Sequence, residues 1–304
     1  MEFGGWKVTV AATGETPSAV AALEEKGGYI ITHVGQIERI DGGPFSTEQL
    51  EETLTFLTCF FSFVLGRWSS PCLSVGFDAS GKRVYEEWGI RRCADGPWHG
   101  FASWFDSRHA ELFPQVLPGF WKLWSCETWN DPLARALGWY MEANQAASGL
   151  GVDSALIFSQ LALELLSWTY CVLDRRMVSA DAFNQRRLSA ADKLRLLVRS
   201  LDIPLEIPET LSALHARPGR RWEDSMEAIT DLRNGLVHPG RDQRVSPDAY
   251  CDAWLLSMWY LDLVLLRLCG HRGNYANRLL LGRWEGEVEP VPWSSQQPAG
   301  QSEA

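Results

Sequence analysis

Five segments with apolar residues at helical spacing follow one another between residues 131 and 270, and they constrain the fold more than any other feature of the sequence. In the first segment, Leu133, Leu137 and Tyr140 recur at intervals of three and four residues, which is typical of one face of an α-helix. The last segment begins at Ser246, and the proline that follows suits the first position of a helix. Because short connections join the segments, we predict an all-α bundle over residues 126–275.

The preceding part of the chain has a mixed pattern. Residues 6–12 and 29–40 are rich in residues that favour strands. Glycine pairs at positions 27–28 and 42–43 bound the second of these stretches, as is typical of strands that end in turns. Ser46 begins a helix, since Gln49 three residues later completes a capping-box pattern. We therefore predict a mixed α/β domain over residues 1–125, with a small antiparallel sheet and one long helix, and assign the whole chain to the α+β class.

A β-hairpin is predicted near residue 80. Residues 72–77 and 84–88 have strand-like composition, and they flank the sequence Asp-Ala-Ser-Gly at positions 78–81. Asp, Ser and Gly are residues that favour turns between paired strands.

Two further stretches have no regular pattern. Residues 98–129 contain several tryptophans without helical or strand period, so we expect an irregular aromatic connection. Residues 276–304 end in a run rich in Pro, Ser and Gln, and we expect a C-terminal extension that is partly disordered.

The composition is that of a globular protein, with 46% hydrophobic and 22% charged residues. The net charge of −10 does not favour nucleic-acid binding by the molecule as a whole. However, residues 131–273 hold 16 basic and 18 acidic side chains, so most of the negative charge lies outside them. The helical half is therefore the part that could approach a polyanion.

The seven cysteines are scattered and none forms a Cys-x-x-Cys pair, which fits a reducing compartment. No His, Cys and carboxylate set has the usual zinc spacing, so we predict no metal and no cofactor. The start of the chain has no signal-peptide pattern, and the most hydrophobic runs, at 56–65 and 254–268, are short or interrupted by charge. We expect a soluble, cytoplasmic protein that does not use a membrane.

Residues 231–239 carry the most reactive side chains of the helical half, with Arg233, Asn234 and His238 within six positions. On a continuous helix Arg233 and His238 would point about 140° apart. Gly235 and the proline after His238 favour a helix that ends near the imidazole, which removes this separation. Arg can clamp a phosphate through two hydrogen bonds, and His transfers protons near neutral pH.

This arrangement resembles the HEPN domain superfamily, in which a helical bundle carries an Arg, a polar residue, a short spacer and a His. The resemblance rests on Arg233, Asn234 and His238 and on the acidic helix stretch at 161–166, which contains Glu164, and it covers residues 131–270. It implies a metal-independent RNA endonuclease whose homodimer, formed through the helical domain, brings two motifs to one cleft.

The resemblance also implies a role for each residue. His238 is the acid/base at the ribose 2′-hydroxyl and the leaving oxygen, Arg233 stabilises the phosphate, and Asn234 orients the site. Glu164 and Asp231 are supporting residues, Glu164 by holding Arg233. A role in bacterial defence or a toxin–antitoxin system follows as an expectation, with a trigger or protein partner at the N-terminal domain.

A second interpretation is a non-catalytic module that dimerises or binds a ligand or protein. In that case Arg233 pairs with Asp231, Glu227 or Glu164, and His238 only caps the helix end. The two interpretations differ in whether the Arg233 and His238 side chains open onto a shared cleft or are buried in ion pairs.

Overall fold

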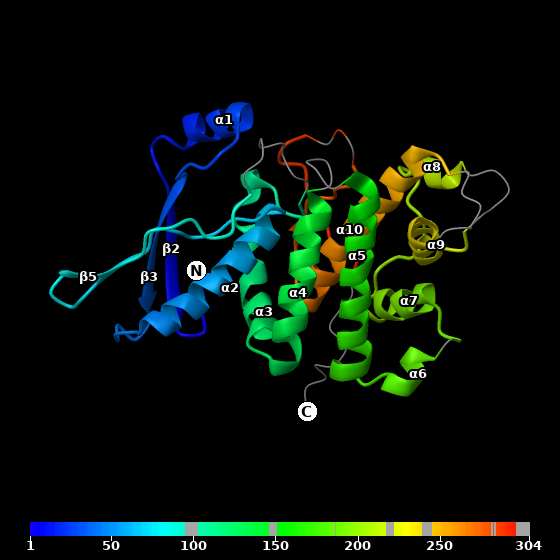
Figure 1. Cartoon of the computed structure of the whole chain (residues 1–304), viewed down its shortest axis with the longest axis horizontal. Coiled ribbons are helices and arrows are strands. Elements are labelled where there is room, and N and C mark those ends of the chain that lie inside the picture. The colour runs from blue at the N-terminus through cyan, green and yellow to red at the C-terminus, as the bar shows by residue number, and fades with distance from the viewer. Residues whose placement is uncertain are drawn as a thin grey trace. The chain divides into compact units, whose positions relative to one another are not determined.

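The computed structural model describes residues 1–94, 103–145, 151–185, 187–216, 222–238, 245–280, 282 and 284–295. The chain divides into two compact units, Met1–Ser103 and Trp104–Ala304. This division comes before the expected boundary at residue 125. The helix Leu112–Trp124, which lies between the two positions, packs against helices of the second unit. The fold class is α+β, as predicted, with a small antiparallel sheet at the N-terminus and a helical C-terminal region (Figure 1).

Unit 1 is built on a three-stranded antiparallel sheet in the order β1-β2-β3. The strands are β1 (Glu2–Phe3), β2 (Trp6–Ala12) and β3 (His33–Arg39). Between β2 and β3 lies α1 (Thr16–Lys26), a helix that the sequence reasoning did not predict.

The long helix of unit 1, α2 (Thr47–Leu65), begins and ends as predicted. Ser46 caps it through a capping box with Gln49, and Gly66 ends it in the left-handed conformation. Its Phe56 ring lies 4.5 Å from that of Phe3 in the sheet, centroid to centroid. Helix and sheet thus share one aromatic core.

The predicted hairpin is present as β4 (Val75–Phe77) and β5 (Arg83–Glu86). The Asp78 carboxylate accepts hydrogen bonds from the backbone N–H groups of Ser80 and Lys82, which shapes the turn. The strands are shorter than expected, and a β-bulge interrupts the pairing at Gly76 and Phe77.

Unit 2 is a helical bundle with more helices than the five predicted. Within its described part the main helices are α3 (Leu112–Trp124), α4 (Glu127–Asn144), α5 (Gly151–Trp168), α7 (Ala190–Ser200), α9 (Ser225–Val237) and α10 (Pro247–Leu268). The shorter elements are the 3-10 helix η1 (Ser107–His109), the π-helix η3 (Thr169–Asp174), α6 (Ala180–Asn184) and α8 (Ser212–His215). Helix α5 is central, since it packs against α4, α7, α9 and α10.

The expectation of an irregular connection over 98–129 is wrong for residues 112–124, which form α3. Its prolines hid the pattern: Pro114 lies in the first turn, where a helix tolerates proline, and Pro118 lies inside. Gly119 allows a close approach to α10, because a Cβ atom there would lie only 1.7 Å from the Cys269 carbonyl oxygen. Residues 95–102 lie outside the described residues.

The chain after α10 packs against the helical unit. Strands β6 (Asn274–Tyr275) and β7 (Glu289–Pro290) pair antiparallel, and Tyr275 and Trp293 are buried. The expected disorder of the C-terminal extension is therefore not found in its described part, and residues 296–304 lie outside the described residues.

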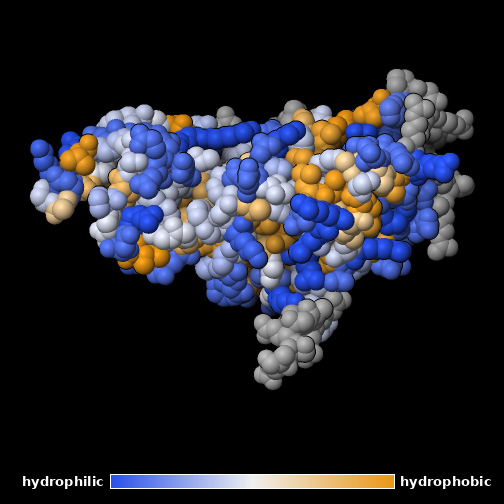
Figure 2. All heavy atoms as spheres, turned by 90° about the horizontal axis from the view of Figure 1, so that it is seen from below, coloured by the Kyte–Doolittle hydropathy of each residue, from blue (hydrophilic) through white to orange (hydrophobic). Residues whose placement is uncertain are grey.

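Residues 151–174 and helix α10 are long and apolar enough to cross a membrane. Both are largely buried inside unit 2, as the core helices of a soluble protein are. On the face seen in Figure 2, hydrophilic residues are interspersed with hydrophobic ones. The chain is thus compatible with a soluble protein.

Candidate functional site

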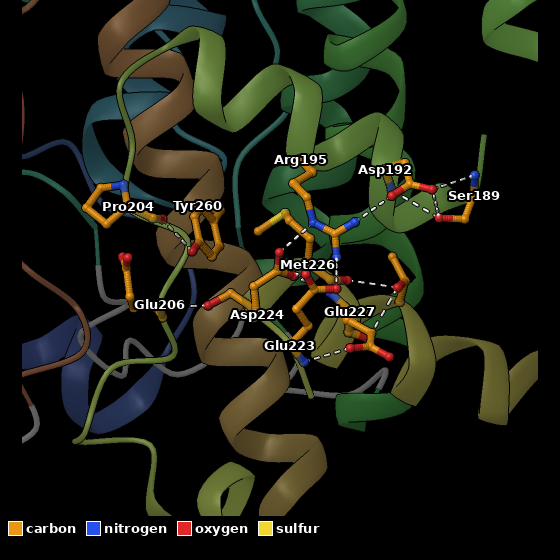
Figure 3. Close-up of polar contacts among 12 residues, drawn as sticks. Ser189, Asp192, Arg195, Pro204, Glu206, Glu223, Asp224, Met226, Glu227 and Tyr260 are labelled. Atoms are coloured by element: carbon orange, nitrogen blue, oxygen red, sulfur yellow. Dashed lines mark hydrogen bonds and ion pairs between the residues drawn. The ribbon is translucent and has the colours of Figure 1, made fainter. Parts of the chain in front are cut away.

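The candidate site lies at the C-terminal end of α9, and ion pairs at the other end of this helix fix its position. Asp224 caps α9 by accepting a hydrogen bond from the Glu227 backbone N–H at 3.0 Å. The Arg195 guanidinium of α7 binds both Asp224 carboxylate oxygens and also Asp192 (Figure 3). The hydrogen bond to Asp224 raises the pKa of Arg195, so the guanidinium that binds the two aspartates stays charged.

The middle of α9 is held by apolar packing. Met226, Ile229 and Leu232 are buried on the face that packs against α5, α7 and α10. Their burial leaves the remaining face of the last turn for polar side chains. The helix end is therefore a rigid platform rather than a loop.

His238 is the first residue beyond the helix. Its backbone is extended, with φ −117° and ψ 98°, while its N–H still donates to the Asn234 carbonyl oxygen at 3.0 Å. The prediction of a helix end beside the imidazole is thus met, and the side chain is exposed. His238 follows Asn234 by four positions, and the contact shown between the two residues is this backbone hydrogen bond.

Arg233 is half-buried and lies beside Asn234. Its Nη1 donates to the Asn234 Oδ1 at 3.2 Å, whereas its Nε is buried without a hydrogen-bond partner. Buried polar groups without partners are uncommon in folded proteins and call for an explanation, such as a water or an ion that the site takes up. Arg233 and Asn234 are thus in side-chain contact, and His238 follows them at the end of the same helix.

The carboxylates proposed to hold Arg233 have other partners. Asp231 accepts a hydrogen bond from the Trp222 indole at 3.2 Å, Glu227 accepts from the Glu223 backbone N–H at 2.7 Å, and Glu164 accepts from Gln160 at 2.6 Å. Within the described ranges no carboxylate forms an ion pair with Arg233. Helices α5 and α9 are in contact, but Glu164 does not bind Arg233.

The helix end can bind an anion. The Arg233 guanidinium supplies a permanent positive charge. A phosphate held by Arg233 would meet an amide and an imidazole on the same helix end. By residue type, a guanidinium can bind an anion and an imidazole can transfer a proton.

A second polar cluster, which sequence reasoning missed, lies inside unit 2. We call it the buried cluster: Tyr140, Asn144, Asp262 and Arg278. Arg278 donates to Asp262 at 2.7 Å, to Asn144 at 2.8 Å and to Tyr140 at 3.0 Å, and Tyr140 donates to Asp262 at 2.6 Å. The one available sequence signal was a single Asp inside the apolar run of α10.

The buried cluster is closed to solvent. The side chains of Arg278 and Asp262 are 1% and 0% exposed. Burial raises the pKa of Asp262, and the Arg278 guanidinium opposes that shift. Burial also raises the pKa of Tyr140 well above its ordinary value. We therefore assign this cluster to the fold and not to a reaction.

Potential metal ligands and one buried Cys–His pair occur in other parts of the chain. Among the described residues, no group of three or more His, Cys, Asp and Glu side chains is placed to hold a metal ion. Cys269 and His271 are both buried, and His271 binds the Asn274 carbonyl oxygen at 3.0 Å, so the pair has a structural role.

These features define a two-unit α+β protein with a candidate anion-binding site at a helix end. Residues 126–290 match the YopA C-terminal domain, and residues 1–99 match the YopA central domain. The chain belongs to the YopA family.

A curated relative is the SPbeta prophage-derived uncharacterized protein YopA of Bacillus subtilis (strain 168), which is 28% identical over 274 residues. The match covers 90% of the chain and 60% of that protein, so the chain spans about 60% of its relative's length. No solved structure matches.

The family assignment corrects the resemblance to the HEPN superfamily. The helical half matches the YopA C-terminal domain and no HEPN family, so the resemblance was wrong. An Arg and a His five positions apart at a helix end is a short pattern that unrelated bundles can share. The roles that the resemblance implied, and the homodimer through the helical domain, lose that support.

Proposed function

We propose that the end of α9 binds a phosphate of RNA and that the chain is a ribonuclease that uses His238 as its base. The observation that carries the proposal is the state of Arg233, which no carboxylate of the described residues neutralises. A guanidinium held only by the neighbouring amide keeps donors for a phosphate.

The chemistry follows from the groups present. Arg233 binds the nonbridging phosphate oxygens, and Asn234 fixes the guanidinium through the hydrogen bond that it already accepts. The neutral imidazole of His238 takes the proton of the ribose 2′-hydroxyl while the 2′-oxygen bonds to phosphorus. The bond from phosphorus to the 5′-oxygen breaks, and the leaving oxygen takes a proton from water. The products are a 2′,3′-cyclic phosphate and a free 5′-hydroxyl.

This route uses side chains alone, so we expect cleavage to continue in the presence of a chelator. The setting that we propose is the cytoplasm, where RNA is the substrate of a defence or toxin–antitoxin ribonuclease. Asp231 and Glu164 take no part in this route, because their carboxylates accept hydrogen bonds from Trp222 and Gln160 and neither holds Arg233.

The test is RNA cleavage by the purified full chain in the presence of EDTA. Changing His238→Ala should reduce the rate by about 100-fold or more, the usual contribution of a general base. The matched control is His215→Ala, since His215 is another exposed histidine of unit 2 and binds only the Pro208 carbonyl oxygen at 3.3 Å. Equal rates in the two variants, or no cleavage of any RNA, would reject the proposal.

A second candidate is a non-catalytic binding module, and exposed apolar side chains of unit 1 favour it. Unusually many large hydrophobic residues of this unit are exposed, including Tyr29, Ile30, Ile31, Val34, Ile40, Phe77, Val84 and Trp88. Exposed apolar groups on this scale mark surfaces that bind other proteins. Under this function, His238→Ala leaves partner binding unchanged, while substitutions in unit 1 abolish it.

A further inference from the structure

The outer edge of β3 is an unpaired sheet edge. Strand β3 lies at the end of the order β1-β2-β3, with β2 on one side (Figure 1). Residues 33–36 are exposed, so neither a helix nor a loop of the described part of the chain covers this half of the strand. A free strand edge presents backbone donors and acceptors that readily pair with another strand.

The register of the sheet shows which backbone groups are free. Thr13 N–H donates to the Thr32 carbonyl oxygen, and Ile40 N–H donates to the Gly5 carbonyl oxygen, both at 3.0 Å. Because such bonds recur at every second residue of an antiparallel pair, the even-numbered residues of β3 bind β2. His33, Gly35 and Ile37 therefore direct their N–H and C=O groups outward.

The exposed half of the edge, residues 33–36, lacks the usual protection against pairing. Natural edge strands are often blocked by proline, by lysine or by an inward-pointing charge. Strand β3 contains neither proline nor lysine, and Val34 on it is 59% exposed. Gly35 lies at the centre of the exposed segment and leaves room for a second backbone.

The pattern of side chains around the edge is self-complementary. If two copies pair antiparallel about a two-fold axis at Gly35 and the pairing continues past both ends of β3, Ile30 lies opposite Ile40 of the partner subunit. Both are apolar and exposed, at 48% and 54%. In the same register Arg39 faces an isoleucine and Glu38 faces a threonine, so no like charges meet.

We propose that β3 pairs with β3 of a second copy of this chain, so that the two small sheets join into one six-stranded antiparallel sheet. The occupant is a second copy because one register both pairs the exposed isoleucines and keeps charges apart. Such an interface is isologous, since each copy contributes the same strand. It lies entirely in unit 1 and is independent of the site on α9.

On the proposed two-fold axis Gly35 lies opposite the same residue of the second copy, so a substitution at this position brings two identical side chains together. A Cβ atom at Gly35 would lie 3.5 Å from the Thr9 carbonyl oxygen, an ordinary contact, so a side chain is tolerated. In Gly35→Lys two ammonium groups meet, and in Gly35→Glu two carboxylates meet. Each variant alone should dimerise about fivefold more weakly than the original chain, whereas a mixture of the two should recover pairing.

The measurement is sedimentation velocity of the full chain over the micromolar concentration range. The matched control is Gln36→Lys, which adds the same charge one residue away, where it faces a valine of the partner and not itself. A chain that stays monomeric throughout overturns the proposal. A dimer that tolerates both Gly35 variants, or a mixture that does not recover pairing, also overturns it.

Discussion

Replacing Arg278 by methionine tests whether the buried cluster holds the helical unit together. Methionine keeps much of the side-chain volume but removes the charge and all three donors. Asp262 then loses its partner at 2.7 Å, and Asn144 loses its partner at 2.8 Å. Since Asp262 is 0% exposed, water cannot replace the lost donors without opening the core.

The expected loss of stability is large for a single substitution. Removing one member of a buried ion pair typically costs about 3–5 kcal/mol, because the remaining charge is left without compensation. For a unit of about 200 residues, 1 kcal/mol corresponds to about 2–4 °C in Tm. The unfolding transition of the helical unit should therefore fall by about 6–20 °C.

The loss should also depend on pH. Burial without a counter-ion raises the pKa of Asp262 in the folded variant above its value in the unfolded chain, which is about 4. A raised folded-state pKa gives stability that is present at low pH and lost as the pH rises. The difference between Arg278→Met and the original chain should therefore shrink as the pH falls from 7 toward 4.

Differential scanning calorimetry at a series of pH values measures both effects. Arg135→Met is the control, since Arg135 is an exposed arginine of α4 that lies 3.7 Å from an exposed aspartate, and surface pairs of this kind contribute little. If Arg278→Met lowers Tm no more than Arg135→Met at pH 7, the buried cluster does not stabilise the fold and the reasoning is refuted.

Two further predictions concern contacts within the same unit. Gly119→Ala should destabilise the unit because the added Cβ would overlap the Cys269 carbonyl oxygen. Gly138→Ala has open space around the added Cβ and should stabilise α4 by about 0.5–1 kcal/mol. Chemical denaturation of both variants checks that the two changes in unfolding free energy have opposite signs. The hydrogen bond from His109 to the Gly286 carbonyl oxygen raises the pKa of the imidazole above 6.5, so this contact contributes stability at low pH that is lost as the pH rises through the folded-state pKa. An NMR titration of His109 checks this, and a midpoint at or below 6.5 would contradict it.

Local signals in the sequence located most of the helices and strands. Ser46, Ser189 and Ser246 all cap helices, and the strand over residues 6–12 has the predicted bounds. These features depend on neighbouring residues, which the sequence displays directly. The helix end at His238 was predicted for the same reason, from Gly235 and the following proline.

Features that depend on distant residues escaped prediction. Helix α3 carries two prolines, and its packing on α10 depends on one glycine contact across about 150 residues of chain. Arg278 lies 134 residues from Asn144 and 138 from Tyr140, so nothing in the sequence around any of them indicates the buried cluster. Whether Arg233 forms an ion pair likewise depends on which partners the nearby carboxylates bind, and sequence spacing does not determine those partners.

The position of Arg278 after the last helix of its cluster, α10, has a consequence for folding during synthesis. Tyr140, Asn144 and Asp262 leave the ribosome before their cationic partner does, and until then the carboxylate has no counter-ion with which to be buried. Unit 1 is complete by Ser103 and is free to fold while the helical part is still being translated. The helical unit must wait until Arg278 has emerged, so a ribosome stalled after α10 would carry one finished unit and one unclosed bundle, open to chaperones and proteases.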